Sequence, residues 1–426
     1  MISGLTLHGV GPAREMKLTF GERLNIITGD NGLGKSFLLD CVWWALTRSW
    51  PAELNQGTPS GRKARPNEGE VGKITAEFVR ASRKTTSLSA TYNRSKECWV
   101  CPAGRPLQHG ITLYAMVDGS IAVWDPARNY RRDEKANRIS AYVFTPNEIW
   151  DGRKEEGQTL LKGLIEDYSN VNFRSSGGHK LLEQMLKILS PPGEDLSPGD
   201  TTRISVIDSR DIPTIRMPYM ADSPVPIIHA SSAIKRMLSI AYILVWAWIE
   251  HRIACKLRGE TPTTHITFLI DEIEAHLHPR WQRTILPALL QAINELMGNP
   301  EVKLLLSTHS PLVMASCEDL FNAEQDRWFD LDYDRSARRV TLTNRTFEKQ
   351  GTAEAWLAGE AFDLSSDRSV GAESVINEAS ALLAGENATP EELTEMEHKL
   401  TDKLNSHDPY LARWRGLVER KFSIQP

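Results

Sequence analysis

The sequence predicts an α/β protein built on a parallel central sheet. Near the N-terminus an apolar strand runs into a glycine-rich loop and then a helix, and from about residue 225 apolar strands alternate with helices. The composition, 41% hydrophobic and 25% charged over 426 residues, excludes disordered, collagen-like and low-complexity chains. The net charge of −5 gives no overall attraction to nucleic acid or to an anionic membrane.

We divide the chain into four parts. Residues 1–150 form the first half of the main domain, and residues 151–222 form an inserted helical section. Residues 223–349 form the second half, with a long helix from about Ser232 to Leu257. Residues 350–426 carry 14 acidic and 7 basic side chains and predict an acidic C-terminal helical module.

The first half begins with short strands up to residue 29 and then shows a helical pattern over residues 35–50. Beyond an exposed loop we expect an antiparallel β layer, with an Asp118-Gly119 hairpin turn between its last two strands. The four expected strands of this layer are Ile74–Val79, Ser87–Tyr92, Ile111–Val117 and Ile121–Trp124.

A cytoplasmic location is expected. The five cysteines are an odd number without the dense spacing of a secreted disulfide framework. The first residues lack the basic and apolar pattern of an export signal. The longest apolar run, Leu238–Ile249, is too short for a bilayer, which takes about twenty residues to span. We therefore expect no membrane partner.

The segment from Gly29 to Ser36 fits the pattern G-x-x-x-x-G-K-[ST] between the expected strand and helix. Glycines let backbone N–H groups turn toward phosphate oxygens, Lys35 reaches the terminal phosphates, and Ser36 is placed to ligate Mg²⁺. The alternative is a glycine-rich turn with a solvated lysine. The expected nucleotide-binding residues are Gly29, Asp30, Asn31, Gly32, Leu33, Gly34, Lys35, Ser36 and Phe37.

Two carboxylates follow the apolar strand Ile266–Ile270. Ligands of open α/β sheets bind at the carboxyl ends of strands, where these residues lie. Asp271 would hold the Mg²⁺ ion, and Glu272 would polarise the water that attacks the γ-phosphate. Taken alone, acidic residues in this position are often a solvated turn or a helix cap.

A third polar cluster follows the apolar strand Val302–Leu306 and includes one histidine, His309. We expect this histidine to contact the γ-phosphate or to hold the attacking water, which gives it a catalytic role beside Lys35 and Glu272. A lone histidine could instead be structural or cap a helix.

These three strand ends resemble the P-loop ATPases of the ABC class, in the branch of the RecF-like, structural-maintenance-of-chromosomes and OLD families, often described as AAA-type ATPases. The resemblance covers residues 1–50 and 225–320, and Glu274–Gln282 resembles the segment that OLD-like proteins carry after their carboxylates. It implies ATP and Mg²⁺ as ligands. It also implies Walker A roles for Lys35 and Ser36, Walker B roles for Asp271 and Glu272, and a switch histidine at His309.

In this class a second subunit closes the active site through a signature segment. Here that segment resembles His229–Arg236, which implies that Ser231 and Ser232 reach the nucleotide of a neighbour. It departs from the usual pattern because Ala233 replaces a glycine, and the serines could instead form a plain helix N-cap. The glutamine-loop residue is not placed, and Asn147 and Gln158 are its candidates.

Weaker signals remain. Cys98 and Cys101 have zinc-knuckle spacing but only His109 as a nearby further ligand. Asp330 and Asp332 resemble an acidic nuclease pair, although we expect a solvated edge strand there. Six basic residues would form a DNA-facing patch or simply a solvated loop. They are Arg62, Lys63, Arg65, Arg128, Arg131 and Arg132.

The function expected from this resemblance is an ATP hydrolase that acts as a nucleotide-controlled dimeric clamp in antiphage defence or DNA repair. The stand-alone ATPases of Septu, retron-associated and PARIS-type defence systems look similar in plan. Because no effector is evident in the chain, we expect a separate, nuclease-like effector protein, a homodimer or higher homo-oligomer, and DNA as a candidate partner. The alternative, the ATPase subunit of a membrane transporter, is disfavoured by the degenerate signature segment.

Overall fold

The computed structural model describes residues 1–426 except 80–83, 103–105, 108–109, 130–138, 221–222, 360, 363, 365–367, 386–387 and 424–426. The chain forms two compact units, Met1–Ala353 and Glu354–Pro426. The boundary that we expected from the sequence was at residues 349 and 350. Each unit is described by itself below.

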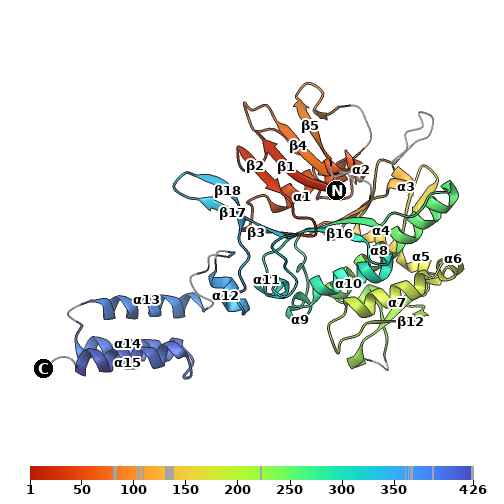
Figure 1. Ribbon diagram of the computed structural model, residues 1–426. Helices are drawn as coiled ribbons and strands as arrows, with labels where there is room; N and C mark the ends of the chain where they lie inside the picture. The colour runs from red at the N-terminus through yellow and green to blue at the C-terminus, as the bar shows by residue number, and fades with distance from the viewer. Residues whose placement is uncertain are drawn as a thin grey trace. The chain divides into compact units, whose positions relative to one another are not determined.

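The first unit is organised around an eight-stranded sheet with the order β18-β17-β3-β16-β15-β7-β8-β9 (Figure 1). The five strands from β17 to β7 run parallel, and the strands at both ends pair antiparallel. The expected parallel sheet is therefore present. Its strands are β3 (Leu24–Gly29), β7 (Ile111–Ala115), β8 (Ile121–Trp124), β9 (Tyr142–Phe144), β15 (His265–Ile270), β16 (Glu301–Ser307), β17 (Arg327–Asp334) and β18 (Arg339–Arg345).

A second sheet of five antiparallel strands has the order β2-β1-β4-β5-β6. It contains only two of the four strands that we assigned to the antiparallel layer, because β7 and β8 belong to the eight-stranded sheet. The expected Asp118-Gly119 turn joins them, where Gly119 N donates to Met116 O. The five strands are β1 (Ile2–His8), β2 (Glu15–Thr19), β4 (Lys73–Val79), β5 (Thr85–Asn93) and β6 (Cys98–Val100).

Helix α1 (Lys35–Thr47) lies between the two sheets and contacts strands of both. Nearly all of its residues are buried, and they join one apolar cluster with residues of both sheets. The N-terminus of this helix is thereby fixed directly beyond the end of β3. The short helices α2 (Pro51–Leu54) and α3 (Pro126–Asn129) follow α1 and β8, respectively.

Helices α7 (Gly178–Leu189), α8 (Ser232–Arg258) and α10 (Ile285–Met297) pack together on the other face of the eight-stranded sheet (Figure 1). Helix α8 matches the long helix expected from Ser232. Among the described residues it is the one helix long and apolar enough to cross a membrane, and 78% of its apolar window is buried within the protein. The short helix α9 (Pro279–Gln282) precedes α10, and α11 (Pro311–Cys317) follows β16.

The section from 151 to 222 contains strands as well as helices. After α4 (Pro146–Asp151), strands β10 and β11 form a hairpin, and α5, α6 and α7 follow. A small antiparallel sheet, β12-β13-β14, then leads back to α8. The bounds are β10 (Arg153–Glu155), β11 (Gln158–Leu161), α5 (Leu164–Ser169), α6 (Val171–Ser175), β12 (Ser197–Thr202), β13 (Ile212–Arg216), η1 (Pro218–Met220), β14 (Val225–Pro226) and η2 (Ile227–His229).

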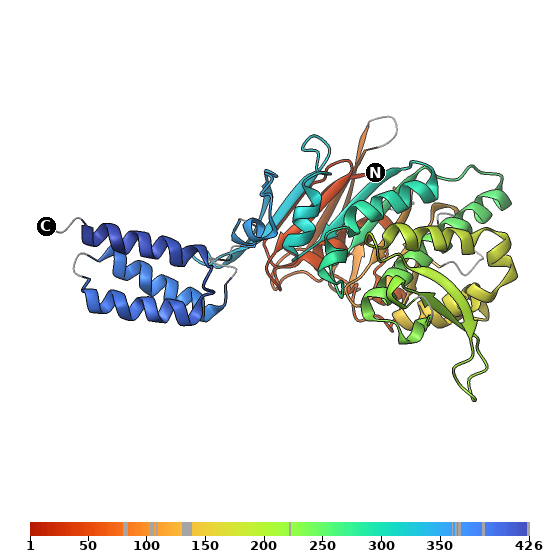
Figure 2. The same ribbon diagram turned by 90° about the horizontal axis from the view of Figure 1, so that it is seen from below.

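The second unit is helical, as its sequence predicts. Helices α13 (Val370–Ala384), α14 (Pro390–Lys403) and α15 (Pro409–Ser423) form a small bundle after α12 (Ala353–Ala358) (Figure 2). Its core consists of apolar side chains, among them Leu393, Leu400 and Trp414. The N-cap Thr389 and Glu392 form a capping box that fixes the start of α14.

Candidate functional site

Three polar loops meet at one edge of the eight-stranded sheet. Strands β3, β16 and β15 are parallel neighbours, so the segments after Gly29, Ser307 and Ile270 all emerge at their carboxyl ends. His309 Nε2, after β16, lies 3.9 Å from Glu272 Oε1, after β15. The structure therefore brings together the three clusters that the sequence singles out.

The loop after β3 has the backbone of a phosphate cradle. Gly29 and Gly34 have φ angles of 129° and 102°, which side-chain-bearing residues rarely adopt. A Cβ atom on Gly29 would clash with the carbonyl oxygen of Leu331, and one on Gly34 would lie 2.7 Å from Pro12 Cγ. Asp30, Asn31 and Gly32 at the loop tip are exposed. Glycine is thus required where the chain turns, and the tip remains open.

Lys35 is the first residue of α1 and is buried at 6% exposure. Its Nζ donates to Gly29 O at 2.7 Å and to Asp30 O at 2.9 Å, so the ammonium lies inside the curl of the loop. Burial lowers the pKa of Lys35, and the nearby carboxylates Glu272 and Asp271 oppose this shift. The loop therefore encloses a cation that faces the carboxylates of β15.

The two carboxylates after β15 differ in freedom. Asp271 is 1% exposed, and its Oδ1 accepts a 2.6 Å hydrogen bond from Ser307 Oγ. Glu272 has an unusual φ of 46°, its N–H donates to Ser307 Oγ at 2.8 Å, and its side chain is about one-third exposed. One serine therefore fixes Asp271 and the backbone of Glu272, while the Glu272 carboxylate stays accessible.

His309 is held by a residue that the sequence analysis gave no role. The half-buried carboxylate of Glu274 accepts the backbone N–H of His309 and, at 2.7 Å, the hydroxyl of Thr308. Burial raises the pKa of Glu274. Burial and the charge of Lys35 both lower the pKa of His309, which favours its neutral imidazole at neutral pH. The only sequence signal for Glu274 was its place at the start of the OLD-like segment.

Two further groups, a buried arginine and a half-buried aspartate, border the site. Arg236, on α8, donates from Nη1 to Met116 O at 3.0 Å and from Nη2 to Asp271 O at 3.2 Å. It is 7% exposed, and this burial lowers the pKa of its guanidinium. Asp40, on α1, accepts a 2.9 Å bond from Tyr114 OH, and burial raises its pKa to about 8. Spacing along the sequence gave no signal for Asp40.

Comparison with known families agrees with this geometry. Residues 4–176 match the family described as "AAA domain", and residues 119–315 match "AAA domain, putative AbiEii toxin, Type IV TA system". The two matches overlap and together run from β1 to α11, through all three loops of the site. Residues 4–315 therefore contain AAA-type P-loop ATPase domain sequence. We call residues 1–353 the ATPase unit.

Two curated relatives of this ATPase are similar over most of their length. The "Retron Vc95 probable ATPase" of Vibrio cholerae serotype O1 biovar El Tor is 27% identical over 74% of this chain and 71% of its own. The "Septu protein PtuA" of Bacillus thuringiensis is 21% identical over 73% and 72%. Among solved structures, the Smc head bound to the C-winged helix domain of ScpA covers 82% of this chain and 98% of its own, at 15% identity and a TM-score of 0.44.

The signature-like segment begins α8 of the ATPase unit. Ser231 is the N-cap, and its hydroxyl accepts a 3.4 Å hydrogen bond from Ile234 N. Ser231 and Ser232 are both exposed. The structure thus supports the N-cap interpretation for Ser231 and leaves the hydroxyl of Ser232 open to solvent. Asn147 and Ser232 line the same cavity, whereas Gln158 lies on the β10-β11 hairpin.

The acidic pair after the site is not a solvated edge strand, and that expectation was wrong. Strand β17 lies inside the sheet between β3 and β18. Asp330 is 3% exposed, accepts a 2.8 Å bond from Thr28 Oγ1 and pairs with Arg345 at 3.1 Å. Only Asp332 is exposed. Asp330 and Asp332 are two residues apart on β17 and therefore share one face of the strand, but Asp330 is already neutralised by Arg345.

The other weak signals gain little from the structure. Cys98 lies on β6 and Cys101 just beyond it, while His109 lies outside the described residues. Within the described parts of the chain, no group of three or more His, Cys, Asp or Glu side chains could hold a metal ion. Only Cys98 and Cys101 of the proposed zinc ligands can therefore be placed, and they do not make a site by themselves.

Three of the described residues of the expected basic patch, Lys63, Arg65 and Arg128, form ion pairs within the chain. Lys63 pairs with Glu53, and Arg65 pairs with Glu97 at 3.8 Å. The guanidinium of Arg128 is largely buried and lies over the rings of Tyr142 and Trp246. Arg131 and Arg132 lie outside the described residues.

Proposed function

We propose that this protein binds ATP with Mg²⁺ at the carboxyl edge of β3, β15 and β16 and hydrolyses it. The observation that carries the proposal is the convergence of the Lys35 loop, the Asp271-Glu272 pair and His309 on that edge. Backbone N–H groups of Gly29–Phe37 and the N-terminus of α1 would hold the phosphates. Ser36 and Asp271 would hold the metal ion, which neutralises charge on the β- and γ-phosphates.

Glu272 has the properties required to polarise the attacking water. Its carboxylate is accessible, and the Ser307 bond fixes its backbone, whereas neighbouring Asp271 is buried and accepts a hydrogen bond from the same serine. A neutral His309 at 3.9 Å could hold that water or a γ-phosphate oxygen without repelling Lys35. The site therefore divides metal binding and water activation between two adjacent carboxylates.

The first test is steady-state ATP turnover in Mg²⁺. We expect Glu272→Gln to bind ATP normally and to reduce kcat by roughly a hundredfold or more, because only water activation is removed. Lys35→Ala should weaken nucleotide binding instead. Glu295→Gln, an exposed position on α10, is the matched control and should behave as wild type. Wild-type turnover by Glu272→Gln would refute the assignment.

The proposed ATPase cycle includes a dimeric clamp. Ser231 and Ser232 are exposed at the N-terminus of α8, where they could meet the γ-phosphate of a second subunit. With ATP, the Glu272→Gln protein should therefore form a symmetric dimer or a higher homo-oligomer, since its nucleotide is not turned over. Mass measured in solution with and without ATP tests this. A monomer under both conditions at high protein concentration would contradict the clamp.

We further propose that the protein works in the cytoplasm in antiphage defence or DNA repair, with a separate nuclease-like effector. The names of the retron and Septu relatives support a defence role. The acidic second unit suits docking of a protein better than contact with DNA. Its 14 acidic residues outnumber its 7 basic ones, and the resulting net negative charge would repel phosphates. The neighbouring genes provide a test, since a nuclease gene would support this role and a permease gene would contradict it.

A further inference from the structure

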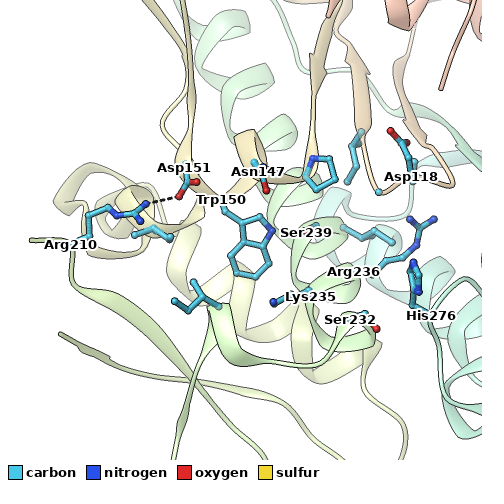
Figure 3. A pocket seen from close by; sticks show the side chains of 17 residues that line it. Asp118, Asn147, Trp150, Asp151, Arg210, Ser232, Lys235, Arg236, Ser239 and His276 are labelled. Atoms are coloured by element: carbon cyan, nitrogen blue, oxygen red, sulfur yellow. Dashed lines mark hydrogen bonds and ion pairs between the residues drawn. The ribbon is translucent and has the colours of Figure 1, made fainter. Parts of the chain in front are cut away.

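A cavity of about 380 Å³ lies beside the candidate ATP site, and no residue of the Gly29–Phe37 loop lines it. Its walls come from the end of β7 and the following turn, from α4, and from the first turns of α8 (Figure 3). Its volume falls in the range of small-molecule sites, which are mostly apolar with a few polar groups. Isoleucines such as Ile228 and Ile240 supply the apolar wall.

The acidic side chains of this cavity are already satisfied within the chain. Asp118 Oδ2 accepts the hydroxyls of Thr58 at 3.1 Å and Ser120 at 2.8 Å. Asp151 Oδ1 accepts Arg210 Nη1 at 2.6 Å. These carboxylates therefore have little capacity left to hold a cationic ligand.

Two of the basic side chains of the cavity, Lys235 and Arg236, are less fully satisfied by hydrogen-bond and ion-pair partners among the described residues than the acidic ones. Among the described residues, the Lys235 ammonium has no hydrogen-bond or ion-pair partner, although the residue is half-buried. Arg236 is more than nine-tenths buried, and its Nε has no partner although Nη1 and Nη2 bond to carbonyls. Buried donors without acceptors are costly, and the positive end of the α8 dipole adds to the field. The unmet chemistry of the cavity is therefore that of an anion site.

One aromatic side chain gives the cavity a flat surface. The half-buried indole of Trp150 lies between the side chains of Asn147 and Lys235 in Figure 3. An indole face stacks on planar rings, and the exposed amide of Asn147 can donate to or accept from the edge of such a ring. A ligand of this size can then reach the indole and the basic groups together.

We propose that this cavity binds a small organic anion with a planar ring, of the chemistry and size of a nucleoside monophosphate. The anionic group lies against Lys235, the charge of Arg236 in the cavity wall adds to its attraction, and the ring stacks on Trp150. Binding itself is independent of ATP turnover. Because Arg236 also holds the Asp271 carbonyl, an occupant would touch the same arginine that borders the metal-binding loop.

The test is calorimetric titration of the Lys35→Ala protein with AMP, GMP and UMP, since that change weakens binding at the separate ATP site. We expect one site for at least one of these nucleotides. Adding Lys235→Gln or Trp150→Leu should weaken it roughly tenfold each. Lys256→Gln is the matched control, because Lys256 is an exposed lysine at the far end of the same helix, and it should leave affinity within about twofold.

Two probes separate the parts of the ligand. Adenosine, which lacks the phosphate, and ribose 5-phosphate, which lacks the ring, should each bind roughly tenfold more weakly than the best nucleotide. Unchanged thermal unfolding of the ligand-free variants would show that they are folded. Failure of all three nucleotides to bind, or binding unchanged by both Lys235→Gln and Trp150→Leu, would overturn the proposal.

Discussion

The two units of this chain differ in where their charged side chains lie. At its sheet edge, the ATPase unit buries Lys35, Asp271 and Arg236 to 7% exposure or less. The core of the second unit is apolar, and its most exposed ion pairs, such as Lys399 with Glu395 at 3.2 Å, lie at the surface. Both arrangements are compatible with a stable fold, yet only the ATPase unit brings opposite charges together away from water.

This difference in charge burial indicates which unit contains the ligand-binding site. Removing charges from water costs several kcal/mol per ion, and well-packed apolar residues of similar volume are often at least as stabilising. Buried charges beside an open sheet edge are therefore better explained by a function than by stability. The second unit carries no comparable cluster among its described residues, which fits a part that binds another protein rather than a reacting ligand.

The largest effect that separates the two units should come from replacing one buried cation. Arg236→Met should lower the free energy of unfolding by about 3 kcal/mol, because it leaves two carbonyls and nearby carboxylates without their cation. Lys399→Met removes an exposed pair and should change it by about 0.5 kcal/mol or less. Urea unfolding followed by tryptophan fluorescence provides the measurement.

Fluorescence suits the arginine variant because ten of the twelve tryptophans belong to the ATPase unit. Far-ultraviolet circular dichroism follows the helices of both units and serves for the lysine variant. Equal effects of the two substitutions would break the contrast between the units.

The sequence predicted most of the elements that position the site. The strands and helix around Gly29–Ser36, the strand before Asp271 and the helix from Ser232 all form where expected. Their signals are strong because long apolar runs and glycine-lysine spacing depend on local chemistry alone.

Sheet membership was harder to predict. Strand β4 alternates buried and exposed residues, as a strand with one covered face does, whereas every residue of β7 and β8 is buried. That continuous apolar pattern marks strands covered on both faces. Weighing it would have moved β7 and β8 from the antiparallel layer to the central sheet.

The buried polar partners could not be predicted from spacing. Glu274 and Arg236 act on residues 35 positions away, His309 and Asp271 respectively, and Asp330 is neutralised by Arg345 across a strand pair. Which polar side chain becomes buried depends on tertiary packing, which a single sequence does not reveal. Asp330-Leu331-Asp332 therefore looked like a solvated strand although one carboxylate faces the interior.

A smaller effect should appear in the pH dependence of the ATPase unit. Burial raises the pKa of Asp40 to about 8, and the carboxylates Asp271 and Asp118 add to this shift, whereas the Tyr114 hydroxyl opposes it. Between about pH 4 and 8 the folded state therefore binds more protons at Asp40 than the unfolded state does. The stability that protonated Asp40 contributes is complete below its unfolded pKa and is lost as pH rises through 8.

We expect the free energy of unfolding of the wild type, relative to Asp40→Asn, to fall by about 0.5 kcal/mol per pH unit from pH 5 to 8. This slope is smaller than the limit of about 1.4 kcal/mol per pH unit. The side chain of Asp40 is only half-buried, so contact with water reduces the effect of burial on its carboxylate. Asparagine cannot ionise but can still accept the Tyr114 hydroxyl, so it removes the proton linkage and keeps the bond.

Asp319→Asn changes an exposed carboxylate, and its profile should follow the wild type. Above about pH 8 the difference should level off, because Asp40 is then ionised in both the folded and the unfolded state. Parallel profiles of the wild type and Asp40→Asn below that pH would show that Asp40 is ionised in the folded protein.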